Sequence, residues 1–334
     1  MGERVLVTGS SGFIGAQVLR HLAAEEGVVV RVFLRPESNG ADLPEGVEVV
    51  RGSFCDREAL AGAVRGVDRI VHLAGVTKAF DEAGYDAGNV MPVQNLLAAV
   101  SEHNRGLKRF LFVSSLTVAG PASEGIRGVS EHDTPSPVSA YGRSKLRAEA
   151  LCMKCAADFP VTIVRPPAVY GPGDRDVLQV FQMLAKGVLL SAGSSSSHAR
   201  QRFSLIYVDD LVDGMMRAAR SEAAAGGVYY ITSPRSSSWD ELIAAAQPVL
   251  GFSSIRKFSL PEPLLFFVAT LLGAVGSLRK KPALINCDKV NELVQDYWVC
   301  SSGRAERDFG FRAETSLAEG VAKTIFWYRQ KGWL

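Results

Sequence analysis

The sequence predicts an α/β fold, in which a doubly wound parallel sheet is followed by a smaller and mostly helical lobe. Short β-branched runs alternate with amphipathic helical patterns over the first half of the chain, and a glycine-rich turn joins the first run to the first helical pattern. From about Val177 onwards helical patterns dominate. Because alternating strands and helices form parallel sheets with right-handed crossovers, we expect a main domain over residues 1–170. The smaller lobe is expected over residues 171–334, with a segment at about 203–220 returning to the main domain.

The glycine-rich turn spans residues 9–15 and directly follows the first strand. Gly9 allows the tight turn out of the strand, Gly12 leaves the backbone open to a close ligand, and Gly15 lets the helix lie near the sheet. Free N–H groups and the positive end of the helix dipole would then face a pyrophosphate. This strand–turn–helix context predicts a dinucleotide-binding (Rossmann) domain rather than an ordinary glycine-rich loop.

The remaining elements of the main domain follow in a regular order. Strands are expected at residues 28–34, 47–52, 69–75, 107–115 and 161–166, and helices at about 57–65, 89–104 and 140–157. The Gly-, Ser- and Pro-rich segment 120–139 is expected to be a long loop, and short strands at 203–208 and 228–231 are assigned to the smaller lobe. Ligands bind at the carboxyl ends of parallel strands. We therefore expect one crevice lined by Thr8, Arg35, Gly75, Ser115 and Pro166.

Composition narrows the functional classes. A formal net charge of +2 over 334 residues gives no basic footprint for nucleic acid. Five cysteines without regular spacing favour reduced thiols in a cytoplasmic protein, and Met1 is followed almost at once by a strand, which leaves no room for a secretion signal. Cys152 and Cys155 have no second cysteine pair, so we interpret them as core residues and expect no metal site.

The tip of the second strand bears on the choice of dinucleotide. An acidic residue at this tip bonds the ribose of NAD, whereas arginine accommodates the 2′-phosphate of NADP. Here the strand ends at Leu34 and Arg35 follows, with no acid at the tip. This favours NADP, although an arginine stacked on the adenine of bound NAD is the alternative.

Tyr141 and Lys145 form the strongest chemical pattern, since they lie one turn apart on a predicted helix and project from the same face. A nearby ammonium lowers the pKa of a phenol, so we expect this pair to move a proton on or off a carbinol oxygen. Ser115 ends a strand that faces the same crevice and would orient that oxygen. His72 lies within an apolar strand and is interpreted as a core residue rather than a base.

With these residues in place, the chain resembles the extended short-chain dehydrogenases/reductases, the group of NAD-dependent epimerases and dehydratases. Residues 8–15 resemble the cofactor loop, Asn89 matches the family's helix asparagine, and residues 165–172 and 207–211 match later motifs. The resemblance implies that Ser115, Tyr141 and Lys145 are catalytic and that the helices bearing Asn89 and Tyr141 form a homodimer interface. It also implies a set of cofactor-binding residues. They are Gly9, Ser11, Gly12, Phe13, Ile14, Gly15, Arg35, Ser53, Phe54, Leu73, Ala74, Gly75, Tyr141, Lys145, Pro166 and Ala168.

Departures from the family pattern favour one branch. No acidic pair follows Ser115, which argues against dehydration, and Pro166-Pro167 stand where sugar-nucleotide epimerases usually carry an asparagine. Residues 114–121 and the Arg-Pro-Pro exit resemble the 3β-hydroxysteroid dehydrogenase and dihydroflavonol reductase branches. Ser53 replaces the family's usual Asp near the adenine, so recognition there is expected to depend on backbone groups around Phe54.

The leading hypothesis is therefore an NAD(P)-dependent oxidoreductase that interconverts a secondary alcohol and a ketone on a small, fairly apolar substrate. The alternatives are a sugar-nucleotide 4-epimerase with tightly held NAD and a non-catalytic redox sensor on the same fold.

Several other residues have two interpretations. The apolar run Leu264–Leu278, followed by Arg279-Lys280-Lys281, is either a buried helix of the lobe or a monotopic membrane contact. Lys78 either reaches the cofactor or is solvated, and Asp209 and Asp210 are expected to cap a helix. Three basic residues near the Ser-rich loop Ser194–Ser197 could bind an anionic group of the substrate or could simply be solvated. They are Lys186, Arg200 and Arg202.

Overall fold

The main domain is built on a seven-stranded sheet in the order β11-β6-β5-β4-β1-β2-β3, with every described neighbour pair parallel. The computed structural model describes residues 2–38, 40, 43–123, 127–192, 200–279 and 286–334. The chain reverses direction along the sheet between β1 and β4, which is the switch point where doubly wound folds bind ligands. The strands are β1 (Glu3–Thr8), β2 (Val28–Leu34), β3 (Glu48–Arg51), β4 (Arg69–His72), β5 (Arg109–Val113), β6 (Val161–Arg165) and β11 (Val228–Tyr230).

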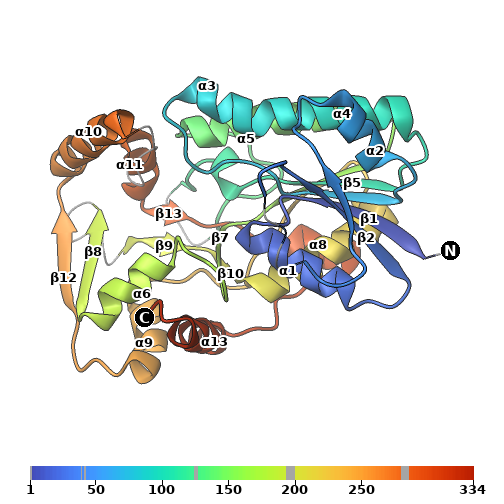
Figure 1. Cartoon of the computed structure of the whole chain (residues 1–334). Helices are drawn as coiled ribbons and strands as arrows, with labels where there is room; N and C mark the ends of the chain where they lie inside the picture. The colour runs from blue at the N-terminus through green and yellow to red at the C-terminus, as the bar shows by residue number, and fades with distance from the viewer. Residues whose placement is uncertain (1, 39, 41–42, 124–126, 193–199, 280–285) are drawn as a thin grey trace.

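Helices cover both faces of this sheet (Figure 1). One face carries α1 (Phe13–Ala23), α8 (Val208–Arg220) and α12 (Gly303–Phe309), and the other carries α2 (Arg57–Val64), α4 (Met91–His103) and α5 (Ala140–Lys154). Successive strand residues point to opposite faces: in β1, Val5 and Val7 join the first core whereas Leu6 joins the second. This period of two is why short apolar runs in the sequence give two separate cores.

Two predicted placements change. The strand at 228–231 is not part of the smaller lobe, because β11 pairs with β6 and forms the edge of the main sheet. The helix expected from Asn89 begins earlier, with α3 (Glu82–Tyr85) and a π-helical turn at Asp86–Val90 before α4. The segment that we expected to return at about 203–220 includes α8, which packs in the first core.

The smaller lobe combines helices with short parallel strand pairs. Its helices are α6 (Leu178–Ala185), α9 (Trp239–Leu250), α10 (Glu262–Leu278), α11 (Cys287–Leu293) and α13 (Leu317–Gln330). Its strand pairs are β8 (Val188–Ala192) with β12 (Arg256–Leu260), and β9 (Arg202–Phe203) with β13 (Tyr297–Trp298). A third pair, β7 (Ala168–Tyr170) with β10 (Leu205–Tyr207), leads from the sheet to the lobe. The Ser-rich loop Ser194–Ser197, together with Lys280 and Lys281, lies outside the described residues.

Candidate active site

The turn between β1 and α1 depends on two close backbone approaches. Gly9 has φ +75°, and a Cβ there would lie 2.6 Å from the backbone nitrogen of Ala74. A Cβ at Gly15 would lie 2.1 Å from the carbonyl oxygen of Gly9. The segment after β4, the turn and α1 converge here, so only glycine fits at both positions. Gly12 is the N-cap of α1 and provides no side-chain capping bond, so N–H groups of the first turn are available to bind a ligand.

Buried polar atoms near this turn also fit a dinucleotide. Among the described residues, Ser10 Oγ and Ser114 Oγ are buried without a hydrogen-bond partner in the protein. Such groups are uncommon in native proteins and call for a further partner, such as water or a ligand. Together with the glycine cradle, they support a dinucleotide along the carboxyl edge of the sheet.

The loop after β4 is fixed by Asn89. Its Oδ1 accepts a hydrogen bond from Val76 N at 2.8 Å, and its Nδ2 donates to Val76 O at 3.1 Å and to Ser144 Oγ at 2.9 Å. Asn89 is buried and belongs to the π-helical turn, a feature that often occurs at functional sites. It therefore ties the Gly75 loop to α5, the helix that carries Tyr141.

His72 lies in the core, as predicted. It is fully buried, and its Nδ1 shares a hydrogen bond with Thr8 Oγ1 at 2.8 Å. Burial lowers the pKa of His72 to about 3, so the imidazole is neutral at physiological pH. It joins the ends of β1 and β4.

Ser115, Tyr141 and Lys145 come together at the ends of β5 and the start of α5. The Lys145 ammonium is buried, donates to Val113 O at 2.7 Å and lies 4.5 Å from the centre of the Phe112 ring. Ser115 caps a short 3₁₀ turn, and its side chain also bonds Tyr141. The phenol lines a cavity and is not enclosed in the core.

The electrostatics differ from the sequence prediction. Burial raises the pKa of Tyr141, with Glu292 as the next contribution, and the hydrogen bond from Ser115 only partly offsets this. The prediction that Lys145 lowers the pKa of Tyr141 is therefore wrong for the groups that the protein itself supplies. The physical reason is that the ammonium is directed at Val113 O and is itself buried, which lowers the pKa of Lys145 to about 8.

The sequence predictions missed a buried ion pair between Glu149, one helical turn after Lys145, and Arg165. Glu149 accepts from Arg165 Nε at 2.9 Å and from its second guanidinium nitrogen at 2.6 Å, and Arg165 also donates to the Tyr230 hydroxyl at 3.1 Å. Tyr141, Lys145 and Glu149 are spaced by four residues, so the helical period was the signal that could have found the carboxylate. Glu149 is the main group that favours the charged form of Lys145.

Helix α11 supplies a second set of carboxylates that the sequence predictions missed. Asp288 accepts from the backbone nitrogen of Ala140 at 2.6 Å, and Glu292 accepts from Ser139 Oγ at 2.6 Å. These bonds fix the N-terminus of α5, one residue from Tyr141. No sequence pattern links positions about 150 residues apart, so only the fold brings them together.

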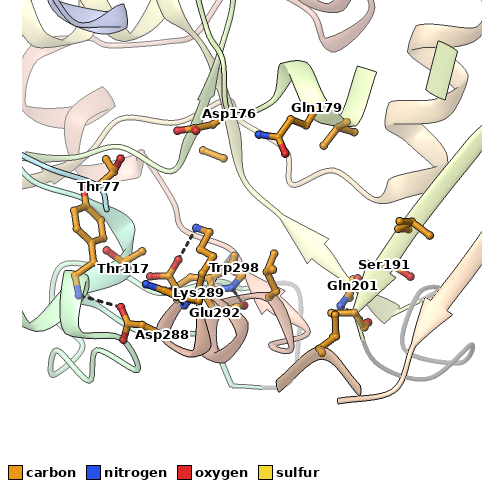
Figure 2. A pocket seen from close by; sticks show the side chains of 18 of the residues that line it. Thr77, Thr117, Asp176, Gln179, Ser191, Gln201, Asp288, Lys289, Glu292 and Trp298 are labelled. Carbon is orange, nitrogen blue, oxygen red and sulfur yellow. Dashed lines mark hydrogen bonds and ion pairs between the residues drawn. The ribbon is translucent and has the colours of Figure 1, made fainter. Parts of the chain in front are cut away.

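A cavity of about 730 Å³ opens beside the phenol. Figure 2 shows Thr77 and Thr117 on one side of it, Ser191 and Gln201 on the opposite side, and Lys289 and Glu292 between them. The main domain lines the cavity with the hydroxyl groups of Ser115, Thr117 and Tyr141. The smaller lobe adds apolar side chains among its polar ones. The apolar ones are Val180, Met183, Leu190, Leu260, Leu265 and Leu293.

The other predicted cofactor residues lie along the same edge of the sheet. Ser11 lies in the turn before α1, and Phe13 and Ile14 begin that helix. Leu73 and Ala74 follow β4, Pro166 follows β6, and Ala168 begins β7. Arg35 follows β2 with its side chain 72% exposed and 3.4 Å from Glu37. Phe54 packs between the rings of Phe33 and His72, and Ser53 precedes it at the surface.

The residues with two interpretations are also placed. Lys78 pairs with Asp176 at 3.0 Å at the cavity, and Lys186 lines the cavity, whereas Arg202 pairs with Glu241 and Arg200 with Asp296. The capping prediction for Asp209 and Asp210 is wrong, because Tyr207 is the N-cap of α8 without a side-chain cap. Asp210 instead accepts from Thr315 N at 3.1 Å and anchors the approach to α13.

Cys152 is buried and Cys155 packs beside it, as expected for core residues. No metal-binding cluster occurs among the described residues.

Residues 5–232 match the NAD dependent epimerase/dehydratase family. The chain belongs to this family. It is 31% identical to the ceramide reductase of Caulobacter vibrioides over 99% of this chain and 96% of that protein. It is 27% identical to the 2-alkyl-3-oxoalkanoate reductase of Stenotrophomonas maltophilia, over 96% of this chain and 98% of that one. The structure of UDP-glucuronic acid 4-epimerase from Bacillus cereus with UDP-glucuronic acid and NAD shares the fold, with a TM-score of 0.77, 22% identity and 98% and 99% of the two chains covered.

The protein is thus an enzyme of the extended, NAD-dependent short-chain dehydrogenase/reductase type. The predicted family and the predicted Rossmann fold are confirmed.

Proposed function

We propose that this enzyme reduces the ketone of an amphipathic lipid that carries a long alkyl chain next to a 3-oxo group. The observation that carries the proposal is the lining of this cavity, which combines Ser115 and Tyr141 of the main domain with the apolar side chains of Leu190, Leu260 and Leu265 of the smaller lobe. A carbonyl head would lie at the two hydroxyl groups and the alkyl chain against the leucines. The activities named for the two relatives, a ceramide reductase and an alkyl-oxoalkanoate reductase, support the same class.

Within the proposal, Ser115 orients the substrate oxygen and Tyr141 donates the proton that the forming alkoxide requires. Bound NAD(P)H would supply the hydride. Lys145 would hold the nicotinamide ribose. Burial and, after it, Glu292 raise the pKa of Tyr141, so the phenol is protonated before it donates.

Turnover of a soluble medium-chain 3-oxo ester with NADPH or NADH tests this function. Tyr141→Phe should lower kcat by about 10²- to 10⁴-fold. Tyr85→Phe is the matched control, because Tyr85 also lines the cavity and its ring centre lies 6.0 Å from that of Tyr141. The proposal fails if 3-oxo esters are inert while UDP-sugars are epimerised at C4, and the redox-sensor alternative fails if any substrate is turned over through Tyr141.

Arg35 supports a preference for NADP. Its guanidinium is exposed at the tip of β2, and Arg51 donates to Ser38 O at 2.7 Å, which shapes the loop that follows. Arg35→Ser should raise the KM for NADPH by about 10- to 100-fold, the loss of a charge-assisted hydrogen bond, and leave the KM for NADH unchanged. A larger loss with NADH would show that Arg35 serves NAD instead.

The same proposal includes a cytoplasmic homodimer. The five free cysteines support a reducing compartment, and helices α4 and α5 lie side by side on one outer face of the sheet (Figure 1). Met91 on α4 and Met153 on α5 are exposed there. Light scattering should give twice the chain mass, and Met153→Glu should shift the mass to that of a monomer.

A further inference from the structure

Helix α10 presents an apolar face to solvent. Its outward residues follow the helical spacing i, i+3, i+4, i+7, i+8 and i+11, and each is at least 40% exposed. They are Leu264, Phe267, Val268, Leu271, Leu272 and Val275. Its inward side is apolar too, with Ala269 buried and Leu265 and Phe266 half-buried. A helix that is apolar all round is normally covered, so this face requires an occupant.

The apolar surface continues onto neighbouring elements. Leu190 on β8 and Phe258 on β12 are direct partners in the strand pair and are 44% and 50% exposed. Leu293 at the end of α11 is 41% exposed. We call these three residues and the six of α10 the lobe patch. It holds nine of the fourteen exposed large hydrophobic residues among the described part of the chain, and α10, β8 and β12 lie together at the end of the molecule farthest from the N-terminus (Figure 1).

The lobe patch is continuous with the cavity. Leu190 and Leu293 belong to the patch and also line the cavity, and Leu265 lines it from the inner side of α10. The apolar side of the substrate site therefore reaches the surface within the patch. A water-soluble partner would not need this connection, whereas an alkyl chain leaving a lipid layer would follow it without crossing water.

Helix α10 does not cross a bilayer. Its 17 residues would extend about 26 Å, less than the ~30 Å hydrocarbon core, and among the described helices none combines the length and hydropathy of a membrane span. Exposed Arg256 and Arg279 flank the patch, as cations do in helices that lie at a membrane surface.

We infer that the lobe patch docks on the surface of a lipid bilayer, with α10 in the plane of the interface and the cavity opening toward the acyl chains. The delivery of a long-chain substrate rests on the proposed function, whereas the docking does not. A second copy of the chain is the competing occupant.

Flotation of the full-length protein with vesicles tests the docking. We expect recovery with the vesicles, of phosphatidylcholine alone and more strongly of phosphatidylcholine with phosphatidylglycerol. Phe267→Asp should weaken partitioning about tenfold or more, because burial of a phenylalanine side chain accounts for at least one decade. Phe326→Asp on α13 is the matched control, since Phe326 is 62% exposed and Phe267 is 61% exposed.

Three results would overturn the inference. The first is wild-type protein that does not bind either type of vesicle. The second is an equal loss of vesicle binding in Phe267→Asp and Phe326→Asp. The third is a wild-type dimer that Phe267→Asp converts to a monomer. Turnover separates docking from the activity. Phe267→Asp should leave kcat/KM for a soluble short-chain 3-oxo ester unchanged and raise the KM for a vesicle-borne long-chain one, whereas a wild type inactive on both contradicts the proposed function alone.

Discussion

Glu149→Gln is expected to weaken both the fold and the charge of Lys145. The wild-type carboxylate accepts two bonds from Arg165, at 2.9 and 2.6 Å, and both side chains are only 5% exposed. The glutamine keeps one oxygen acceptor but no charge, so the guanidinium stays buried with its Tyr230 bond as the remaining strong contact.

Removing one member of a buried ion pair costs about 3–5 kcal/mol. Because one acceptor survives, we expect the free energy of unfolding to fall by about 3 kcal/mol, the low end of that range. A loss of this size is a large share of a typical stability of about 5–15 kcal/mol, yet the variant should still fold. The matched control is Asp213→Asn, since Asp213 pairs with Arg217 at 2.7 Å but both side chains are more than 40% exposed. It should cost about 0.5 kcal/mol or less.

The functional consequence concerns the pKa of Lys145, which is about 8 in the folded chain. Glu149 is the main group that raises this pKa against the effect of burial, so Glu149→Gln should lower it further. The alkaline fall of kcat/KM for the dinucleotide should then shift to lower pH. Urea denaturation and a pH–rate profile measure the two effects. Unchanged stability together with an unchanged profile, or an equal loss in Asp213→Asn, would refute the coupling of this ion pair to Lys145.

Three further predictions address the rest of the chain. Gly15→Ala should abolish dinucleotide binding measured by calorimetry, because the added Cβ would lie 2.1 Å from a backbone oxygen. The control is Gly62→Ala in α2, where an added Cβ meets open space, and it should leave stability unchanged or raise it by up to about 1 kcal/mol. Retained binding in Gly15→Ala would contradict this packing. Since Lys145 releases its proton at about 8 when folded and at 10.5 when unfolded, the unfolded state binds more protons between these values and the free energy of unfolding should rise with pH across them. Denaturant titrations should show that Lys145→Met removes this rise, and an identical slope in wild type and variant would contradict the assignment. Asp288→Asn should cost about 1 kcal/mol in urea denaturation through the lost charge at the N-terminus of α5, and an unaltered midpoint would show that its bond to Ala140 contributes nothing.

Local features of the chain were predicted from sequence because their causes are local. The glycine turn depends on three positions within seven residues, and the strands show in apolar runs that the pleat divides between two cores. The one-turn spacing of Tyr141 and Lys145 puts both on one face of α5. The same periodicity extends to Glu149, but a carboxylate on a helix gives no sign of burial until its partner is known.

Tertiary structure decided everything that depends on distant segments. The place of β11 at the sheet edge follows from its pairing with β6, and a strand of three residues carries no pattern that specifies a partner. The carboxylates of α11 reach α5 across about 150 residues. The pKa of Tyr141 rises where the sequence predicted a fall, because burial and Glu292 act on the phenol while Lys145 bonds Val113. Sequence spacing determines which side chains can share a face, whereas burial and the direction of each charge are set only when segments distant in the sequence pack together.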